Sequence, residues 1–130
     1  MPRKERILSP SVPETGTHWS QALKAGNILF ISGQTSSLPG GSIGAPGDIA
    51  AQARIAFTKI RHLCEAAGAT MEDIVKLTLL LRDIDDQDAL YSVYDGFFSG
   101  ENFPTDTLIG NVHLAQKGFL VEIEAIVAVG

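Results

Sequence analysis

Residues 48–68, with the sequence DIAAQARIAFTKIRHLCEAAG, predict one long amphipathic helix of about 19 residues. Asp48 is typical of a helix N-cap, because its short side chain can accept a hydrogen bond from a free N–H of the first turn. Gly68 is typical of the C-terminal cap. Between them, apolar residues recur at spacings of three and four and share one face: Ile49, Ala53, Ala56, Phe57, Ile60, Leu63, Cys64 and Ala67.

The segments around this helix predict strands and a second helix. The strands are expected at residues 6–8, 19–25, 27–32, 71–81, about 105–112 and about 119–129. The second helix is predicted from Asp85 to about Gly100, with an apolar side formed by Leu90, Val93, Tyr94 and Phe97. The glycines and prolines of residues 37–47 predict a loop.

Alternation within the strands assigns side chains to the two faces of a sheet. Glu122 and Glu124 share one face of the last strand, whereas Val121 and Ile123 share the other. In the strand at 71–81 we expect one face to carry Val75, Leu77, Leu79 and Leu81.

This order of elements favours an α+β fold with one domain over residues 1–130. We expect a two-layer sandwich, in which a mixed sheet of about six strands is covered on one face by two helices. The other face of the sheet would lack a covering layer, so the pattern also favours an oligomer.

Composition argues against several functions. The net charge of −5 and the pI of about 5.0 disfavour nucleic-acid binding, which needs basic side chains to neutralise phosphates. No apolar run approaches the ~20 residues that span a bilayer. The lone Cys64 and the absence of a secretory signal favour the cytoplasm. The scattered histidines lack the spacing of a zinc site, so no metal and no cofactor are expected.

Several motifs, in a consistent order, extend over nearly the whole chain. They are Trp19-Ser20-Gln21-Ala22, Phe30-Ile31-Ser32-Gly33-Gln34, Asp48-Ile49-Ala50-Ala51-Gln52, Glu65-Ala66-Ala67-Gly68-Ala69, Val93-Tyr94-Asp95-Gly96-Phe97-Phe98 and Leu120-Val121-Glu122-Ile123-Glu124-Ala125-Ile126. These motifs closely resemble those of the Rid/YjgF family, whose best-known members hydrolyse reactive imines and enamines.

The resemblance implies a chorismate-mutase-like fold and a homotrimer whose sheets line a central barrel. It also implies three small-molecule clefts between the subunits. A few members of the family have been described as ribonucleases, and the acidic composition of this chain does not favour that activity.

The resemblance further implies the residues of the cleft. Glu122 corresponds to the glutamate that holds the attacking water, and Ser32 and Gly33 belong to a turn whose backbone completes the site. Trp19 stands where an aromatic residue, usually tyrosine, closes the cleft. Three positions on the second helix and the following strand differ from the family pattern, which has asparagine, arginine and a small or thiol-bearing residue: they are Tyr91, Asp106 and Leu108.

Asp106 matters most, because the family arginine binds the carboxylate of the substrate. At about 4 Å and a dielectric constant of about 20, such a pair attracts by roughly 4 kcal/mol, and a carboxylate in its place repels instead. One interpretation is a cleft for a neutral or cationic ligand. The alternative is an ordinary solvated turn residue after Pro104.

The other candidate residues also have two readings. Glu122 either holds water or pairs with structural groups, and if Asp106 lies beside it, one of the two carboxyls should have a raised pKa. Trp19 and Tyr91 suit stacking on an unsaturated ligand, and they equally suit packing at an interface.

Two functions therefore remain. The first is hydrolysis of an imine, an enamine or a related metabolite other than a simple 2-imino acid, with Glu122 as the catalytic residue. The second is a trimer that binds a small metabolite without turning it over.

Overall fold

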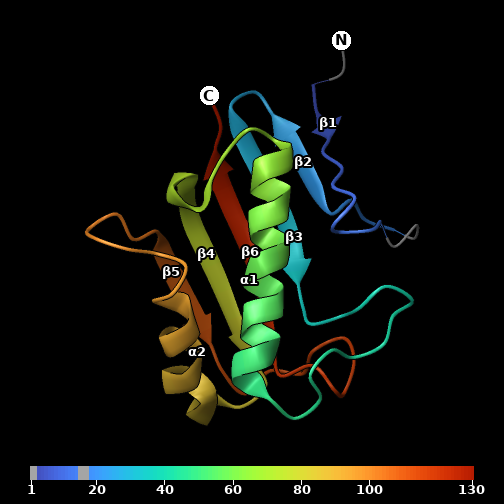
Figure 1. Ribbon diagram of the computed structural model, residues 1–130, viewed down its shortest axis with the longest axis vertical. Coiled ribbons are helices and arrows are strands. Elements are labelled where there is room, and N and C mark those ends of the chain that lie inside the picture. The colour runs from blue at the N-terminus through green and yellow to red at the C-terminus, as the bar shows by residue number, and fades with distance from the viewer. Residues whose placement is uncertain (1–2, 15–17) are drawn as a thin grey trace.

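The computed structural model describes residues 3–14 and 18–130, which form a six-stranded sheet with two helices on one face (Figure 1). The chain forms, in order, β1 (Glu5–Arg6), β2 (Ala22–Ala25), β3 (Ile28–Gln34), α1 (Ile49–Ala66), β4 (Ile74–Leu81), α2 (Gln87–Tyr94), β5 (Thr105–Ile109) and β6 (Val121–Ala128). Short 3₁₀ helices at Met71–Asp73 and Ile84–Asp86 precede β4 and α2. This architecture confirms the predicted two-layer α+β sandwich.

The sheet is mixed, as predicted. Its strand order is β1-β2-β3-β6-β4-β5, and among these described strands only β4 and β5 pair in parallel. The C-terminal strand β6 therefore lies in the middle of the sheet, between β3 and β4. Strand β5 forms one edge of the sheet, next to α2 (Figure 1).

Helix α1 follows the predicted pattern closely. Asp48 Oδ1 accepts a hydrogen bond from the Ala51 N–H at 3.0 Å, and Gly68 after the helix has a φ of +78°. Phe57 and Cys64 are fully buried, and burial raises the pKa of the Cys64 thiol to about 12. Cys64 is therefore a core residue rather than a reactive thiol.

Gln52 is a polar residue on the buried side of α1. Its side-chain amide donates to the Gly118 carbonyl at 3.0 Å and accepts from the Leu120 N–H at 2.9 Å. The same amide nitrogen donates to the Ala45 carbonyl at 3.3 Å. Gln52 thus satisfies backbone groups of two loops and fixes the entry into β6.

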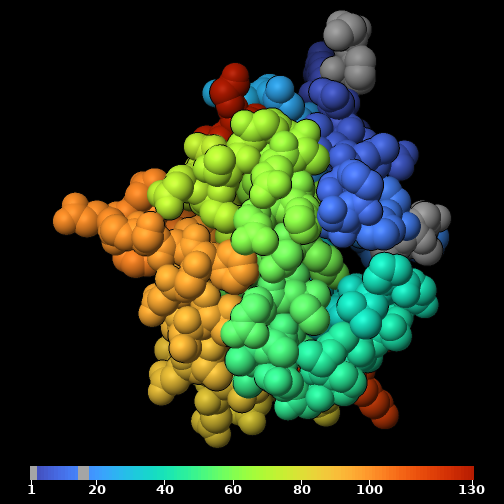
Figure 2. Space-filling model, in the orientation of Figure 1, coloured from blue at the N-terminus to red at the C-terminus, as the bar shows by residue number. Residues whose placement is uncertain are grey.

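The second helix is shorter than predicted. It ends at Tyr94, because the N–H groups of Gly96 and Phe97 bond to the carbonyls three residues earlier and turn the chain out of the helix. The turn packs Phe98 into an aromatic cluster with Phe57 and Tyr94. The segment that follows, up to β5, projects from the body of the molecule (Figures 1 and 2).

The face assignment of Val75 was wrong. A β-bulge between Ile74 and Lys76 inserts one residue into the pairing of β4 with β6, so Val75 is 48% exposed while Leu77 is buried. Beyond the bulge, Leu77, Leu79 and Leu81 share the buried face as predicted.

The sheet face opposite the helices is called the open face, and on β4 and β6 it carries Thr78, Leu80, Glu122 and Glu124. On β3 the aromatic side chain of Phe30 is 48% exposed. Across the described residues, no helix combines the length and the apolar character needed to cross a membrane.

Candidate functional site

Glu122 lies on the open face in the middle of the sheet. It pairs with Leu80 across β4, and its carboxyl is half-buried. Burial raises the pKa of this carboxyl above its usual value, and the charge of the neighbouring Glu124 raises it further. A carboxyl of this kind exchanges a proton at a pH closer to neutrality than an ordinary glutamate does.

Gly33 makes room for the Glu122 side chain. A Cβ atom at Gly33 would lie 2.8 Å from Cδ and 2.9 Å from Cγ of Glu122, so any larger residue would force the carboxylate to move. The pairing of β3 with β6 shifts register between Ile31 and Gln34, and Gly33 falls within this irregular stretch. The structure therefore brings together the predicted site residues Glu122 and Gly33.

Ser32 holds the segment that precedes β2. Its hydroxyl donates to the Ser20 carbonyl at 2.6 Å, and its N–H donates to the Gln21 carbonyl at 2.9 Å. Next to it, the buried Gln34 amide donates to the Gln21 side chain at 2.8 Å. These bonds fix the position of Trp19, which is adjacent to Ser20 in the chain.

A cavity of about 600 Å³, called the Glu122 cavity, lies beside this group of residues. Trp19, Gly33 and Glu122 line it together with residues of the loop between β3 and α1. The remaining lining comes from Ser11, Val12, Pro13, Glu14, Gln21, Gln34, Thr35, Ser37, Leu38, Pro39, Gly40, Gly41, Ile55, Lys59, Ala115, Gln116 and Phe119. Polar groups and apolar surface thus meet in one concave site, as is typical of small-molecule sites.

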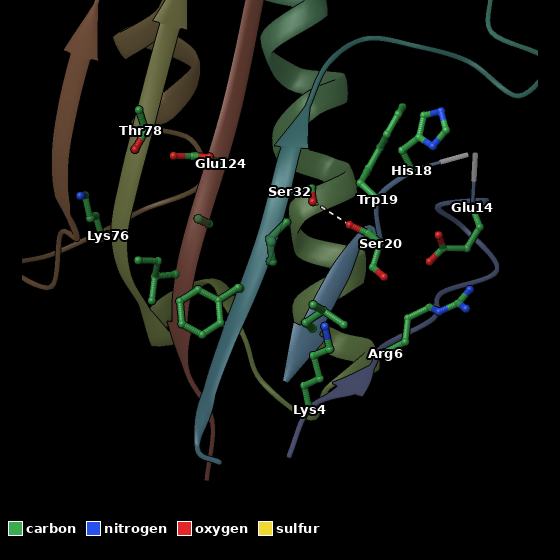
Figure 3. A pocket seen from close by; sticks show the side chains of 15 residues that line it. Lys4, Arg6, Glu14, His18, Trp19, Ser20, Ser32, Lys76, Thr78 and Glu124 are labelled. Carbon is green, nitrogen blue, oxygen red and sulfur yellow. Dashed lines mark hydrogen bonds between the residues drawn. The ribbon is translucent and has the colours of Figure 1, made fainter. Parts of the chain in front are cut away.

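A second cavity, of about 770 Å³, lies on the open face (Figure 3). Lys4 and Arg6 of the N-terminal segment form one side of it, and Lys76 and Glu124 of the central strands form the other (Figure 3). Trp19 lines both cavities and is 52% exposed. A large part of its ring is therefore available to a ligand or to another protein chain.

Tyr91 and Asp106 form a pair on the helix side of the sheet. The Tyr91 hydroxyl donates to Asp106 Oδ2 at 3.0 Å. Burial raises the pKa of Tyr91 to about 12, with a further contribution from this hydrogen bond and from the carboxylate charge. Leu108 follows on the same face of β5 and packs against the core.

Asp106 and Glu122 lie on opposite faces of the sheet. Asp106 pairs in parallel with Leu77, whose side chain is buried under the helices, whereas Glu122 pairs with Leu80 on the open face. The hypothesis that the two carboxyls crowd each other therefore fails within one chain. The raised pKa of Glu122 has other causes, namely burial and Glu124.

Lys59 is the main residue of the cavity that the sequence did not reveal. It lies on α1, and its Nζ donates to both the carbonyl and the hydroxyl oxygen of Ser37 at 3.1 Å. Burial lowers the pKa of Lys59 to about 8. A lysine in the middle of an amphipathic helix usually predicts a solvated side chain, and only the path of the 35–47 loop encloses this one.

Comparison with known proteins shows similarity along almost the full length. The family model described as Endoribonuclease L-PSP matches residues 10–129, a range that includes all the candidate site residues. A RutC family protein of Pyrococcus horikoshii is 38% identical over 123 residues, covering 95% of this chain and 96% of that protein.

Two further matches are similar in extent. A 2-iminobutanoate/2-iminopropanoate deaminase of Escherichia coli K12 is 33% identical over 123 residues, covering 92% of this chain and 94% of that protein. The crystal structure of YyfA from Yersinia pestis, described as a protein of unknown function of the conserved Rid protein family, has a TM-score of 0.89 at 32% identity. That match covers 97% of this chain and 99% of the other.

Proposed function

Since this chain belongs to the Rid/YjgF family, for which the matching model is that of Endoribonuclease L-PSP, we propose that it deaminates an imine- or enamine-type metabolite. The reaction is the hydrolysis of a C=N bond to a carbonyl compound and ammonia, with Glu122 positioning the water. The proposed substrate is not a simple 2-imino acid.

The observation that carries this proposal is the setting of Glu122. Its carboxyl lines a cavity, is half-buried and has a raised pKa, which suits a group that accepts a proton near neutral pH. In the proposed reaction the carboxylate removes a proton from water as the oxygen attacks the C=N carbon. The carboxylic acid then returns this proton to the nitrogen, which gives a carbinolamine. The carboxylate next transfers the hydroxyl proton of the carbinolamine to the nitrogen, and the C–N bond breaks, so ammonia leaves as the carbonyl forms.

We also propose a homotrimer with its clefts between subunits. The open face carries the half-exposed Phe30, which another copy of the chain would cover. Because Asp106 and Glu122 face opposite sides of the sheet, one ligand would contact both only if two subunits contributed to the same cleft. The trimer thus offers a physical route to a site that holds both residues.

The negative charge of Asp106 supports the proposal that simple 2-imino acids are not substrates. This carboxylate is exposed and accepts a hydrogen bond from Tyr91, and the described residues place no cation within 4.0 Å of it. A substrate carboxylate beside it would be repelled, although solvent would reduce the effect. Compounds with a neutral or cationic group at that position would be accepted instead.

The test is ammonia release from a panel of imines and aminomuconate-like enamines. Glu122→Gln should lower the rate at least about a hundredfold, the usual contribution of general acid–base catalysis. Glu124→Gln is the matched control, because it makes the same change two residues away on the same face and should reduce the rate far less. An unchanged rate in Glu122→Gln would exclude the water-positioning role.

The second candidate is a trimer that binds a metabolite without turnover. Asp106, which accepts a hydrogen bond from Tyr91, stands where the family pattern has arginine. The group that would anchor a substrate carboxylate is therefore missing, which favours binding without turnover. A ligand that raises the melting temperature and is recovered unchanged after long incubation would support capture, since a ligand that prefers the native state stabilises it. Consumption of that ligand would exclude it.

The remaining parts of the proposal concern the domain organisation, the cellular compartment and ribonuclease activity. We propose that residues 1–130 act as one domain, because a single sheet includes strands from β1 to β6. We propose the cytoplasm as the compartment, because the single cysteine cannot form a disulfide within the chain, as suits a reducing environment. Ribonuclease activity is not proposed, because the chain has a net charge of −5.

A further inference from the structure

We propose that Lys59 forms an anion-binding subsite in the Glu122 cavity and that the ligand carries a carboxylate remote from its reacting C=N bond. This inference rests on the proposed function in one respect, because it takes the Glu122 cavity as the ligand site. It adds a residue and a substrate class: acids in which several carbons separate the carboxylate from the imine or enamine.

The geometry of Lys59 leaves one donor free. A lysine ammonium has three N–H groups, and two of them are directed to Ser37, one to the carbonyl and one to the hydroxyl oxygen, both at 3.1 Å. The two bonds hold Nζ against the loop at one wall of the cavity. In the part of the chain that the structure describes, no other acceptor bonds to Nζ, so the third N–H is available to a ligand.

Within the described parts of the chain, the charge of Lys59 also has no counter-charge within 4.0 Å. Among residues 3–14 and 18–130 the only side-chain ion pair joins Arg61 and Glu65, so the cavity carboxylates of Glu14 and Glu122 lie more than 4.0 Å from Nζ. Half-burial without a partner lowers the pKa of the ammonium to about 8. A bound carboxylate would supply the missing counter-charge and form a charge-assisted hydrogen bond.

The loop beside Lys59 is held in place by its own hydrogen bonds. The Leu38 N–H donates to the Ser42 carbonyl and the Gly41 N–H donates to the Leu38 carbonyl, both at 2.9 Å. Gly40 and Gly41 have φ values of +90° and +91°, which favour glycine at both positions of this turn. The turn directly follows Ser37, and the loop runs beside α1 (Figure 1). The subsite is thus built before any ligand arrives.

Apolar side chains in the wall of the cavity suit an apolar carbon chain in the ligand. Ile55 of α1 and Phe119 before β6 line the same cavity as Lys59 and Glu122. An apolar carbon chain would pack against these side chains, with its carboxylate at Lys59 and its C=N group at Glu122. The proposed ligand therefore differs from a simple 2-imino acid, whose carboxylate is bonded directly to the C=N carbon.

The experiment measures binding of saturated acids that contain no C=N bond. The probes are straight-chain carboxylates from propanoate to octanoate and the corresponding primary amides, titrated by calorimetry or by NMR. The variants are Lys59→Met, which keeps the apolar stem, Lys59→Arg, which keeps the charge, and Lys24→Met, a control on β2 outside both cavities. Circular dichroism checks that each variant is folded.

We expect carboxylates to bind the parent, Lys24→Met and Lys59→Arg, with longer chains binding more tightly. The Lys59→Met protein should bind them at least about tenfold more weakly, and the amides should bind the parent as weakly as that variant binds the acids. Equal carboxylate binding by the parent and by Lys59→Met would overturn the subsite. A result in which none of the acids binds the parent would also overturn it. If Lys59→Met fails to fold, the parent and Lys59→Arg provide the test. Tighter binding of acids than of amides by both proteins would support the subsite, and equal binding would overturn it.

This test is independent of turnover. If acids bind through Lys59 but no imine releases ammonia, the subsite stands and the deaminase proposal fails. If ammonia is released at the same rate and KM by the parent and by Lys59→Met, the subsite fails and the deaminase proposal stands.

Discussion

The Tyr91 hydroxyl donates a 3.0 Å hydrogen bond to the Asp106 carboxylate and so connects α2 to the edge strand β5. Both residues differ from the pattern that the family resemblance implies. The hydrogen bond needs both residues, because asparagine at position 91 would remove the phenol and arginine at position 106 would remove the carboxylate. The two positions therefore form one unit in this protein.

The titration of Tyr91 should report this pair. Asp106→Asn removes the carboxylate charge and weakens the hydrogen bond, so the pKa of Tyr91 should fall from about 12. It should stay above the ordinary tyrosine value, because burial is the largest cause of the shift. The change can be followed by near-ultraviolet absorbance, since the chain has only two tyrosines, Tyr91 and Tyr94. An unchanged titration curve would show that the pair does not form in solution.

Asp106→Arg should extend activity to simple 2-imino acids. The parent should be nearly inactive on an imine formed in situ from an amino acid, because Asp106, if it lines the cleft as proposed, would repel the substrate carboxylate. The variant should gain at least about tenfold in kcat/KM, which corresponds to about 1.4 kcal/mol of transition-state stabilisation.

Asp88→Arg on α2 is the matched control, because it makes the same charge change at an exposed helix residue outside both cavities. Only Asp106→Arg should gain activity on the 2-imino acid. A parent that is fully active on the 2-imino acid would contradict the electrostatic argument at once.

Glu122→Gln should change stability in a pH-dependent way. Because the folded state raises the pKa of Glu122, folding favours the protonated carboxyl, and the stability of the parent falls as pH rises above the unfolded value of 4.5. The variant does not titrate at this position. It should therefore gain stability relative to the parent as pH rises, by less than about 1 kcal/mol because the carboxyl is half-exposed.

Urea denaturation between about pH 4 and about pH 8 measures this difference. In a Glu124→Gln background the difference should be smaller, because one of the two causes of the raised pKa has been removed. If the parent instead gains stability over Glu122→Gln as pH rises, the carboxylate is stabilised by the fold, and the argument for a proton-accepting role is lost.

Gly33→Ala should impair the site through Glu122. The added Cβ would approach Cδ of Glu122 to 2.8 Å, and relief requires the carboxylate or the strand to move. We expect a loss of roughly 1–3 kcal/mol in stability, the usual cost of overpacking, together with reduced turnover. A double-mutant cycle tests the cause, because Gly33→Ala should cost much less in a Glu122→Ala background. Additive losses would place the strain elsewhere.

The main elements of the fold could be predicted from the sequence because local signals agree with the tertiary structure. In α1 the Asp48 cap, the apolar spacing and Gly68 all specify the same helix. The end of α2 and the exposure of Val75 could not be predicted. Both depend on long-range packing, in one case the aromatic cluster around Phe57 and in the other the register of β4 against β6.

The candidate site was predictable only in part. The family resemblance pointed to Gly33 and Glu122, and the structure places them in contact distance, but no sequence pattern states that one makes room for the other. No sequence pattern marked Lys59 as a cavity residue, because its burial depends on a loop that is distant in sequence from the middle of α1. The sequence could not show whether Asp106 and Glu122 share a face of the sheet, because the answer depends on the register of the parallel pairing between β5 and β4.

The placement of Asp106 and Glu122 on opposite faces of the sheet has a consequence for how such a protein evolves. If Asp106 selects the ligand and Glu122 accepts the proton, as proposed, a mutation at the edge strand would alter which molecules are accepted without disturbing the packing around Glu122. In the proposed trimer, two defective alleles, one altered at each position, would restore a working site when their products assemble in the same trimer. Under that proposal, selection would act on recognition and on chemistry as separate inherited traits.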